Sequence, residues 1–361
     1  MDLGGLGRHL DLFVKTSINI IGWDNGGGLS RDIDILRESL AGEDVVIYVN
    51  ERLQRSGQGG LAVRLLRSLR RTGLGRFIIQ RVLRCPKFDI NVHLEDVRAE
   101  ALWLARRNIL IPNHECFSSQ SCRYLVKVDE VWAKTKIAEQ IFSNLGCEVR
   151  FLGWTSVDRR ASRDGRSLLT ALHIAGASTA KGTEAVLDVW GRNPGWPLLR
   201  VLRRKRDYAG NSLPWRERSM SQNILIIAER IGEHELLRMQ NESALCICPS
   251  EAEGFGHVVL ESLSAGGIVV TTDAPPMNEL ITAESGLLVR VDITKPMGLD
   301  RCYFVDLNDL EKRIRIALEM TDEQRARMGR AARARFETID RAFRLRVKEC
   351  LKTVLERPLH E

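Results

Sequence analysis

The feature that most constrains the fold is a repeated alternation of short β-branched segments with longer amphipathic ones. Strands are predicted at residues 18–21, 45–49, 89–92, 109–112, 130–133 and 149–152, and again at 169–174, 198–202, 224–228, 245–248, 268–271 and 286–289. Helices are predicted between most of them, at 31–40, 136–145, 182–190, 233–240, 256–265 and 277–282. Such alternation is typical of parallel sheets covered by helices on both faces. Because it occurs twice, we predict an α/β chain with two Rossmann-like domains.

A polar, charged and glycine-containing segment at 153–167 predicts the domain boundary. We expect an N-terminal domain over 1–160, a C-terminal domain over 161–338, and a last helix over 339–361 that packs back on the first domain. Thr321 and Gln324 have the spacing of a helix-starting capping box. No apolar run approaches the length that spans a bilayer, and no signal peptide is recognisable.

The segment at 248–280, CPSEAEGFGHVVLESLSAGGIVVTTDAPPMNEL, is the most informative about chemistry. A strand ends before Glu253, a GFG turn follows at 254–256, and the next helix carries Glu261. Glycines allow close approach of the backbone to a ligand, and the unpaired amides of a helix N-terminus favour a phosphate. Carboxylates on both sides can accept hydrogen bonds from sugar and ribose hydroxyls. The segment therefore predicts a nucleotide-sugar site.

This segment resembles the E-x7-E signature of retaining glycosyltransferases of family 4. The resemblance implies a GT-B fold, with a cleft between two Rossmann-like domains and a C-terminal helix that crosses back. It also implies that Glu253 contacts the donor sugar, that Glu261 contacts the donor ribose, and that neither metal nor cofactor is needed. The resemblance is specific over about 168–290; over 1–167 it rests on strand order and a few loops.

Other residues of the second domain carry weaker resemblances. Lys181 stands at a helix start in a segment similar to the one that contacts the donor diphosphate in this family. Ser178 stands near the place of a common arginine, so Ser178, Thr179 or backbone amides are expected to replace part of that contact. The nucleotide base of the donor is expected near Ile231. Glu235 either begins a helix or touches the ligand.

In the first domain, a Gly-Gly-Gly turn at 26–28 follows a predicted strand. It resembles the glycine loop that faces donor phosphate and acceptor in GT-B enzymes. Asp32 and Asp34 imitate a D-x-D metal motif, but on a helix they point about 200° apart. We therefore predict that both are surface charges.

The loop after residue 112 supplies candidates for the reacting centre. By resemblance, His114 is the candidate for contacting the donor sugar or the acceptor, with Glu115 as the alternative for the same place. A histidine there can polarise a hydroxyl, and a glutamate can act as a base for the acceptor. The alternative is a histidine that only orients the loop. His93 and Glu95 are weaker candidates for the same cleft, and Asp158 is a candidate hinge or acceptor contact.

The formal charge of +7 indicates contact with phosphates, nucleic acid or an anionic surface. Residues 52–88 hold lysines and arginines but no acidic residue, and LAVRLLRSLRR at 61–71 predicts a basic amphipathic helix. It is either a peripheral anchor on anionic lipid or a helix covering the first domain. Nucleic acid is not expected, because aromatic stacking residues are scarce there.

The cysteines are scattered and form no C-x-x-C pair. Cys246 and Cys248 are predicted to be buried reduced thiols facing one side of a strand, with a zinc site as the alternative. Reduced thiols favour a cytoplasmic protein, and the basic segment favours the inner face of the cell membrane.

Together these features predict a hexosyltransferase that moves sugar from a UDP- or GDP-sugar to a hydroxyl acceptor. A cell-surface polysaccharide or a lipid-linked glycan is the expected acceptor. The alternatives are a nucleotide-sugar epimerase on the same fold and a non-catalytic protein that binds nucleotide sugar or nucleic acid. The predicted catalytic residues are Glu253, His114 and Glu115. The predicted donor-binding residues are Lys181, Ser178, Gly254, Phe255, Gly256, Glu261, Ile231, Gly27 and Gly28.

Overall fold

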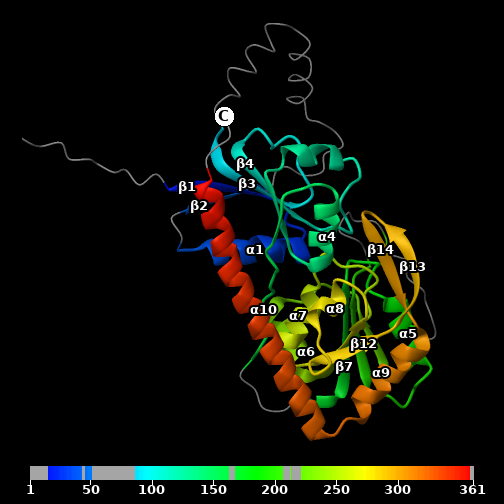
Figure 1. Ribbon diagram of the computed structural model, residues 1–361. Coiled ribbons are helices and arrows are strands. Elements are labelled where there is room, and N and C mark those ends of the chain that lie inside the picture. Colours follow the sequence, from blue (N-terminus) through cyan, green and yellow to red (C-terminus); the bar gives the residue numbers. More distant parts are fainter. Residues whose placement is uncertain are drawn as a thin grey trace, which may run out of the picture.

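The computed structural model describes residues 15–42, 45–50, 86–161, 167–205, 212 and 221–357. These residues form two domains, each built on a six-stranded sheet (Figure 1). The strand order is β2-β1-β3-β4-β5-β6 in the first sheet and β12-β11-β10-β7-β8-β9 in the second, and all their pairings are parallel. In both sheets the order reverses beside the first strand, where ligands of doubly wound sheets bind.

The N-terminal sheet contains β1 (Thr16–Ile21), β2 (Val45–Asn50), β3 (Phe88–Glu95), β4 (Ala105–Pro112), β5 (Glu130–Ala133) and β6 (Val149–Phe151). Its helices are α1 (Gly28–Leu40), the 3-10 helix η1 (Cys122–Lys127) and α4 (Lys136–Asn144). The inner strands β3 and β4 are buried over most of their length, as continuous apolar runs in parallel sheets require.

The C-terminal sheet contains β7 (Ser167–Gly176), β8 (Leu198–Arg203), β9 (Ile224–Ile227), β10 (Ser243–Cys248), β11 (Ile268–Thr272) and β12 (Gly286–Val289). Its helices are α5 (Thr183–Gly191), α6 (Glu233–Glu242), α7 (His257–Ser264), α8 (Met277–Leu280) and α9 (Leu307–Glu319). Every strand and helix predicted for the two sheets is present, and the predicted fold class is confirmed.

A long final helix, α10 (Asp322–Glu356), runs along both domains (Figure 1). It begins with the predicted capping box of Thr321 and Gln324. The predicted segment from 339 onward is the second half of this one helix. Asp340 accepts a hydrogen bond of 2.9 Å from Thr155, and α10 also packs against α1 and α7.

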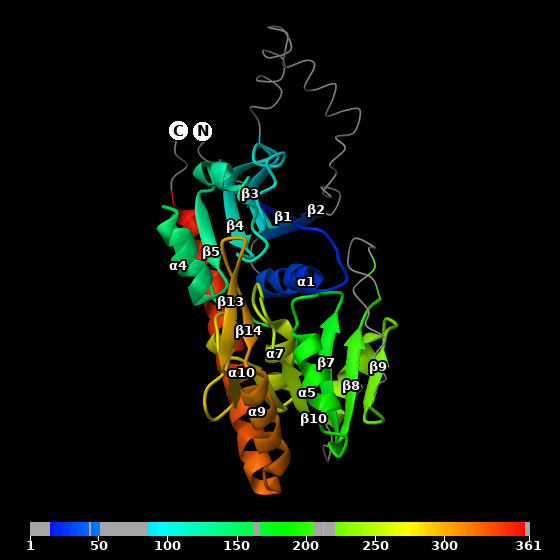
Figure 2. The same ribbon diagram turned by 90° about the vertical axis from the view of Figure 1, so that its right-hand side faces the viewer.

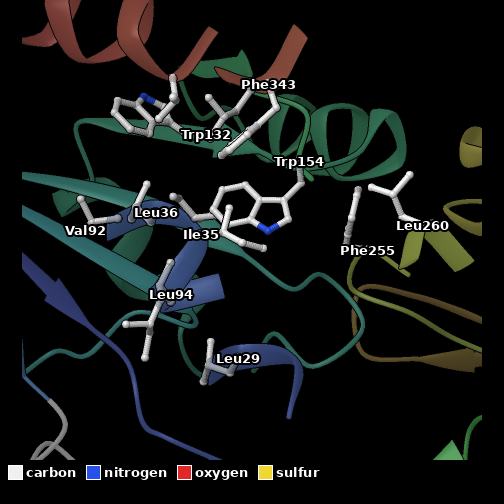
Figure 3. Packing of buried hydrophobic residues seen from close by; sticks show 14 of the residues in the cluster. Leu29, Ile35, Leu36, Val92, Leu94, Trp132, Trp154, Phe255, Leu260 and Phe343 are labelled. Atoms are coloured by element: carbon white, nitrogen blue, oxygen red, sulfur yellow. The ribbon is translucent and has the colours of Figure 1, made fainter. Parts of the chain in front are cut away.

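The largest hydrophobic cluster contains side chains from both domains and from α10. Trp154 packs against Phe343 of α10, with ring centroids 4.9 Å apart, and Phe255 and Leu260 of the second domain lie on its other side (Figure 3). Burial of such large side chains contributes several kcal/mol in total, at roughly 1.5–3 kcal/mol each. The two domains are therefore held in a packed arrangement.

Two further strands, β13 (Val291–Met297) and β14 (Asp300–Val305), form an antiparallel hairpin that the sequence analysis did not predict. It rises from the C-terminal domain beside α4 of the N-terminal domain (Figure 2). The strand β13 exposes most of its residues and contains Pro296, so it lacks the apolar pattern of a core strand.

Within the described residues, no helix combines the length and the apolar character that crossing a bilayer requires. The predicted amphipathic helix at 61–71 lies outside the described residues.

Candidate functional site

Glu253 and Lys181 form an ion pair at the carboxyl ends of β10 and β7. The same Glu253 oxygen accepts a hydrogen bond of 2.7 Å from the Ser250 hydroxyl. Between Lys181 and helix α5 stands Gly182 with φ +64°, where an added Cβ would lie 2.1 Å from the Pro249 carbonyl oxygen. The loops that carry Lys181 and Glu253 therefore meet only because residue 182 is glycine.

His173 of β7 links β10 to the start of helix α5, close to the Lys181–Glu253 pair. Its Nδ1 lies 2.7 Å from the Ile247 carbonyl oxygen and its Nε2 lies 2.9 Å from the Thr183 hydroxyl. Burial lowers the pKa of His173 to about 4, so the imidazole is neutral near pH 7. A neutral ring that faces a carbonyl must donate from Nδ1, and it then accepts from Thr183. Ser178, in the same loop as Lys181, accepts from the Ala180 amide at 3.2 Å.

Glu261 on α7 is 1% exposed and contacts residues of both domains. Its carboxylate lies 3.0 Å from Arg31 Nε and 3.6 Å from Arg159 Nε, and it accepts 3.0 Å from Gln240. Burial alone would raise the pKa of Glu261, but Arg31 and Arg159 outweigh it and lower the pKa. The predicted ribose contact is thus an ionised carboxylate at the domain interface.

Asp32 is not a surface charge, contrary to the prediction. It is 2% exposed, lies 2.6 Å from Lys134 Nζ and 3.1 Å from His257 Nε2, and so links α1 to β5 and α7. Burial opposes ionisation, but Lys134 and His257 outweigh it and lower the pKa of Asp32 to about 2. The prediction was wrong because Asp32 shares a helix face with Leu29 and Leu36, both buried. Asp34 is exposed, as predicted.

The glycine turn at 26–28 faces the second domain. Gly28 begins α1, and the His257 ring lies 3.5 Å from the position of an added Cβ there. Since His257 begins α7, the N-termini of α1 and α7 face each other across the domain boundary. The Gly27 amide donates to Asn25 at 2.8 Å. Gly26 lies against the Arg230 guanidinium, next to Ile231.

Glu115 lies beside the GFG turn. An added Cβ on Gly254 would lie 2.9 Å from Glu115 Oε1 and 2.6 Å from the Asn113 side chain. Burial raises the pKa of Glu115, and the Glu253 carboxylate raises it further. The structure therefore brings two predicted carboxylates close together beside the GFG turn, Glu115 from the N-terminal domain and Glu253 from the C-terminal domain.

His114 is fully buried, and its Nε2 lies 3.1 Å from Asp300 Oδ2 of the hairpin. His93 does not face the cleft, contrary to the prediction. It is fully buried, with Nε2 3.2 Å from Asn108 and Nδ1 accepting from the Arg98 amide, and burial lowers its pKa to about 4. The ring is instead engaged by Asn108 of the neighbouring strand β4 and by the turn after β3.

The remaining predicted residues have structural partners. Asp158 contacts Arg333 of α10 at 2.6 and 2.9 Å, and Glu235 pairs with Arg238 in the first turn of α6. Cys246 and Cys248 are buried, with their sulfurs 3.4 Å apart. In the part of the chain that the structure describes, no three His, Cys, Asp or Glu side chains are placed to hold a metal ion.

Arg31, Arg159, His257 and Asp300 were not predicted as site residues. His257 alone had a signal, as a polar residue directly after the GFG turn at a helix start. The arginines become recognisable only once the fold places them on Glu261, because neither stands in the 248–280 segment.

Comparison with known proteins gives a family match and several similar structures. Residues 216–335 match the family described as "Glycosyl transferases group 1". A glycosyltransferase from Rickettsia africae is 13% identical with a TM-score of 0.64, and the match covers 96% of this chain and 100% of that one. Anabaena HepE in complex with UDP-glucose is 14% identical with a TM-score of 0.65, covering 93% and 99%. The chain has the GT-B fold.

Sucrose-phosphate synthase from Thermosynechococcus elongatus shares this fold at 15% identity and a TM-score of 0.62, over 94% of this chain and 99% of that one. A comparison with curated protein sequences gives no match. In this GT-B chain, the family match covers α7 and the segment before it, including Glu253 and Glu261. Lys181 and the N-terminal loops lie outside that match, and their place in the site rests on geometry.

Proposed function

We propose that this protein is a glycosyltransferase that uses a nucleotide-sugar donor. The observation that carries the proposal is the Lys181–Glu253 pair in the loops that precede α5 and α7, together with the facing N-termini of α1 and α7. Helix N-termini and a lysine are suited to a diphosphate. A carboxylate beside them is suited to sugar hydroxyls.

Each group then has a role. The first-turn amides of α7 and the Lys181 ammonium hold the diphosphate and stabilise its charge as it departs. Glu253 orients the sugar, since its second oxygen is free of Ser250 and can accept from a hydroxyl. The nucleotide base of the donor lies near Ile231. Glu261 accepts from the ribose, on the model of the E-x7-E signature, with Arg31 and Arg159 keeping it ionised.

On the acceptor side, Glu115 is the group best placed to accept a proton. Burial and the Glu253 carboxylate raise its pKa, which favours its uptake of a proton, and it lies against Gly254. His114, whose ring is covered by the hairpin, orients this loop.

The finer points of the proposal follow from the resemblance in the 248–280 segment. The donor is a UDP- or GDP-hexose, the reaction retains anomeric configuration without a metal, and the acceptor is a cell-surface polysaccharide or a lipid-linked glycan. Transfer takes place on the cytoplasmic side, with the basic segment at 52–88 on anionic lipid. The UDP-glucose bound to Anabaena HepE and the group 1 family match support the donor class.

A thermal-shift panel with UDP-glucose, GDP-mannose and ADP-glucose tests the donor. A ligand at 100 times its Kd adds about 2.7 kcal/mol to stability, so one of these sugars should raise the melting temperature clearly. Transfer to a hydroxyl acceptor should then follow in the presence of that donor. No shift with any nucleotide sugar would contradict the proposal, and consumption of donor into an epimer without acceptor would indicate the epimerase instead.

A further inference from the structure

The β13–β14 hairpin touches both loops that carry the facing carboxylates Glu115 and Glu253. It leaves the C-terminal sheet after β12 and returns to α9, as an antiparallel ribbon separate from both sheets. In Figures 1 and 2 it runs up from the C-terminal domain, and its tip reaches the level of α4 of the N-terminal domain. Its contacts with the two loops come from a few consecutive residues at its tip and along β14.

The tip of the hairpin is seated on the backbone of the Glu115 loop. Gly298 has φ +55°, and an added Cβ would lie 2.7 Å from the Glu115 carbonyl oxygen and 3.3 Å from that of His114. The next residue, Leu299, packs on the hydrophobic cluster of the N-terminal domain around Phe117. The tip therefore belongs by contact to the first domain, although its chain belongs to the second.

Asp300 then contacts His114, the side chain next to Glu115. Its Oδ2 lies 3.1 Å from His114 Nε2, and the two side chains are only 9% and 1% exposed. The Tyr303 hydroxyl donates to the other oxygen, Oδ1, at 3.2 Å. Burial and the neighbouring Asp300 raise the pKa of Tyr303 to about 12, so this hydroxyl keeps its proton. Each oxygen of Asp300 thus lies beside a polar group, and the His114 ring is contacted from one side.

The same strand is bonded to the loop that carries Glu253. The Tyr303 amide donates to the Glu251 carbonyl at 2.8 Å, and the Glu251 amide donates to the Ala180 carbonyl at 2.9 Å. Only two residues of β14 therefore separate Asp300, which contacts the Glu115 loop, from Tyr303, which contacts the Glu253 loop. Through Ala180, the connection extends to the residue next to Lys181.

We propose that the hairpin is the positioning element of this site, and that Asp300 is a positioning residue acting through His114. The inference rests on the proposed function. The two carboxylates come from different domains, so domain motion would change their separation. A hydrogen-bonded ribbon that contacts both loops keeps that separation near one value, which is what a reaction between two bound substrates requires.

Hydrogen exchange of the full chain without ligand tests the contact directly. Asp300→Ala should raise exchange of the 113–117 amides about tenfold or more, because the loop loses its partner. Gly298→Ala should also raise exchange of the 113–117 amides, because the added methyl group pushes the hairpin tip away from Glu115. This variant replaces Asp300→Ala in the test if Asp300→Ala does not fold. The matched control is Asp292→Ala, at an exposed acid of β13, which should leave that exchange unchanged. Wild-type exchange at 113–117 in both Asp300→Ala and Gly298→Ala would overturn the proposal.

Kinetics test the route through His114. With the donor that gives the largest thermal shift among UDP-glucose, GDP-mannose and ADP-glucose, Asp300→Ala should lower kcat at least tenfold with little change in donor KM. The double variant His114→Ala/Asp300→Ala should be no slower than His114→Ala alone, since both changes break one contact. If the double variant lowers kcat by the product of the two single effects, Asp300 does not act through His114. If the wild type transfers no sugar at all, the proposed function fails while the exchange result still decides the contact.

Discussion

Arg31 of α1 lies 3.0 Å from the buried Glu261 of α7, so an ion pair joins the first helix of one domain to a helix of the other. Arg159 from the segment between the domains approaches the second oxygen of the same carboxylate. Together with Asp32 on His257, the pair makes the domain boundary polar at its centre. Around that centre lie the loops proposed to bind the donor.

Loss of Arg31 should destabilise the fold. Removing one partner leaves part of a buried charge unpaired, which costs about 3–5 kcal/mol when no other partner remains. Because Arg159 stays in place, we expect Arg31→Met to lower the free energy of unfolding by about 2 kcal/mol in urea titrations. Arg37→Met, on the exposed face of α1, is the control and should match the wild type. Equal stability of both variants would contradict the role of the pair.

Gly182→Ala should damage the approach of the Lys181 and Glu253 loops. The left-handed conformation costs an alanine about 1–2 kcal/mol, and the overlap with the Pro249 carbonyl at 2.1 Å adds to this. We expect a melting temperature at least 5 °C lower and weaker donor binding. Gly191→Ala, which has open space for its Cβ, should melt like the wild type. An undamaged Gly182→Ala protein would mean that the two loops are not held as the structure has them.

Lys181→Ala should weaken donor binding more than it affects folding. The ammonium is proposed to neutralise diphosphate charge, and a hydrogen bond to a charged group contributes about 1.5–3 kcal/mol. Donor affinity measured by calorimetry should therefore fall by roughly tenfold to a hundredfold. Lys312→Ala on α9 is the control and should bind donor normally. Unchanged affinity in Lys181→Ala would remove the lysine from the site.

Glu253→Gln should bind donor yet transfer sugar poorly. The amide keeps the size of the side chain but loses the charge that orients hydroxyls, and such groups contribute on the order of 100-fold to turnover. We expect kcat to fall by at least that factor in a transfer assay. Glu284→Gln, at an exposed position before β12, should retain full turnover. Wild-type kcat in Glu253→Gln would show that the carboxylate has no part in the reaction.

Stability should fall as pH is lowered from 6.5 toward 4. Burial lowers the pKa of both His93 and His173 to about 4, whereas the unfolded chain has the ordinary value of 6.5. Between these values the unfolded state binds the protons and the folded state does not, so acid favours unfolding. Each histidine should contribute a loss of roughly 2–3 kcal/mol over this range.

Urea titrations from pH 7.5 to 4.5 measure this dependence. The range stays above the titration of Asp32, whose stabilising effect is lost only as pH falls from about 3.8 toward 2. His173→Asn should flatten the dependence by about half, whereas His234→Gln, at an exposed position, should not change it. A flat profile for the wild type would show that the buried histidines do not remain neutral on folding.

The strands and helices of both sheets could be predicted because their residues follow the periodicity of parallel α/β folds. β10 and β11, for example, read as short apolar runs bounded by proline, glycine and polar residues. Such local patterns do not depend on distant partners. The GFG turn and its two glutamates were recognisable for the same reason, since they lie within one strand–loop–helix unit.

The β13–β14 hairpin and the buried Asp32 could not be predicted in this way. The hairpin is mostly exposed along β13, so its sequence lacks the alternation of a half-buried strand, and its role comes from contacts with residues almost 200 positions earlier. Asp32 stands on the apolar face of α1, which is a signal of burial, but its partners Lys134 and His257 come from elements far along the chain. Contacts between residues far apart in the sequence, rather than the local sequence pattern, determine both the role of the hairpin and the burial of Asp32.

A crystal structure with the bound nucleotide sugar tests the central claim most directly. We predict the diphosphate at the N-terminus of α7 within hydrogen-bond distance of its first amides and of Lys181, with the sugar hydroxyls on Glu253. A donor bound elsewhere on the protein, away from the N-terminus of α7 and from Lys181, would contradict the account.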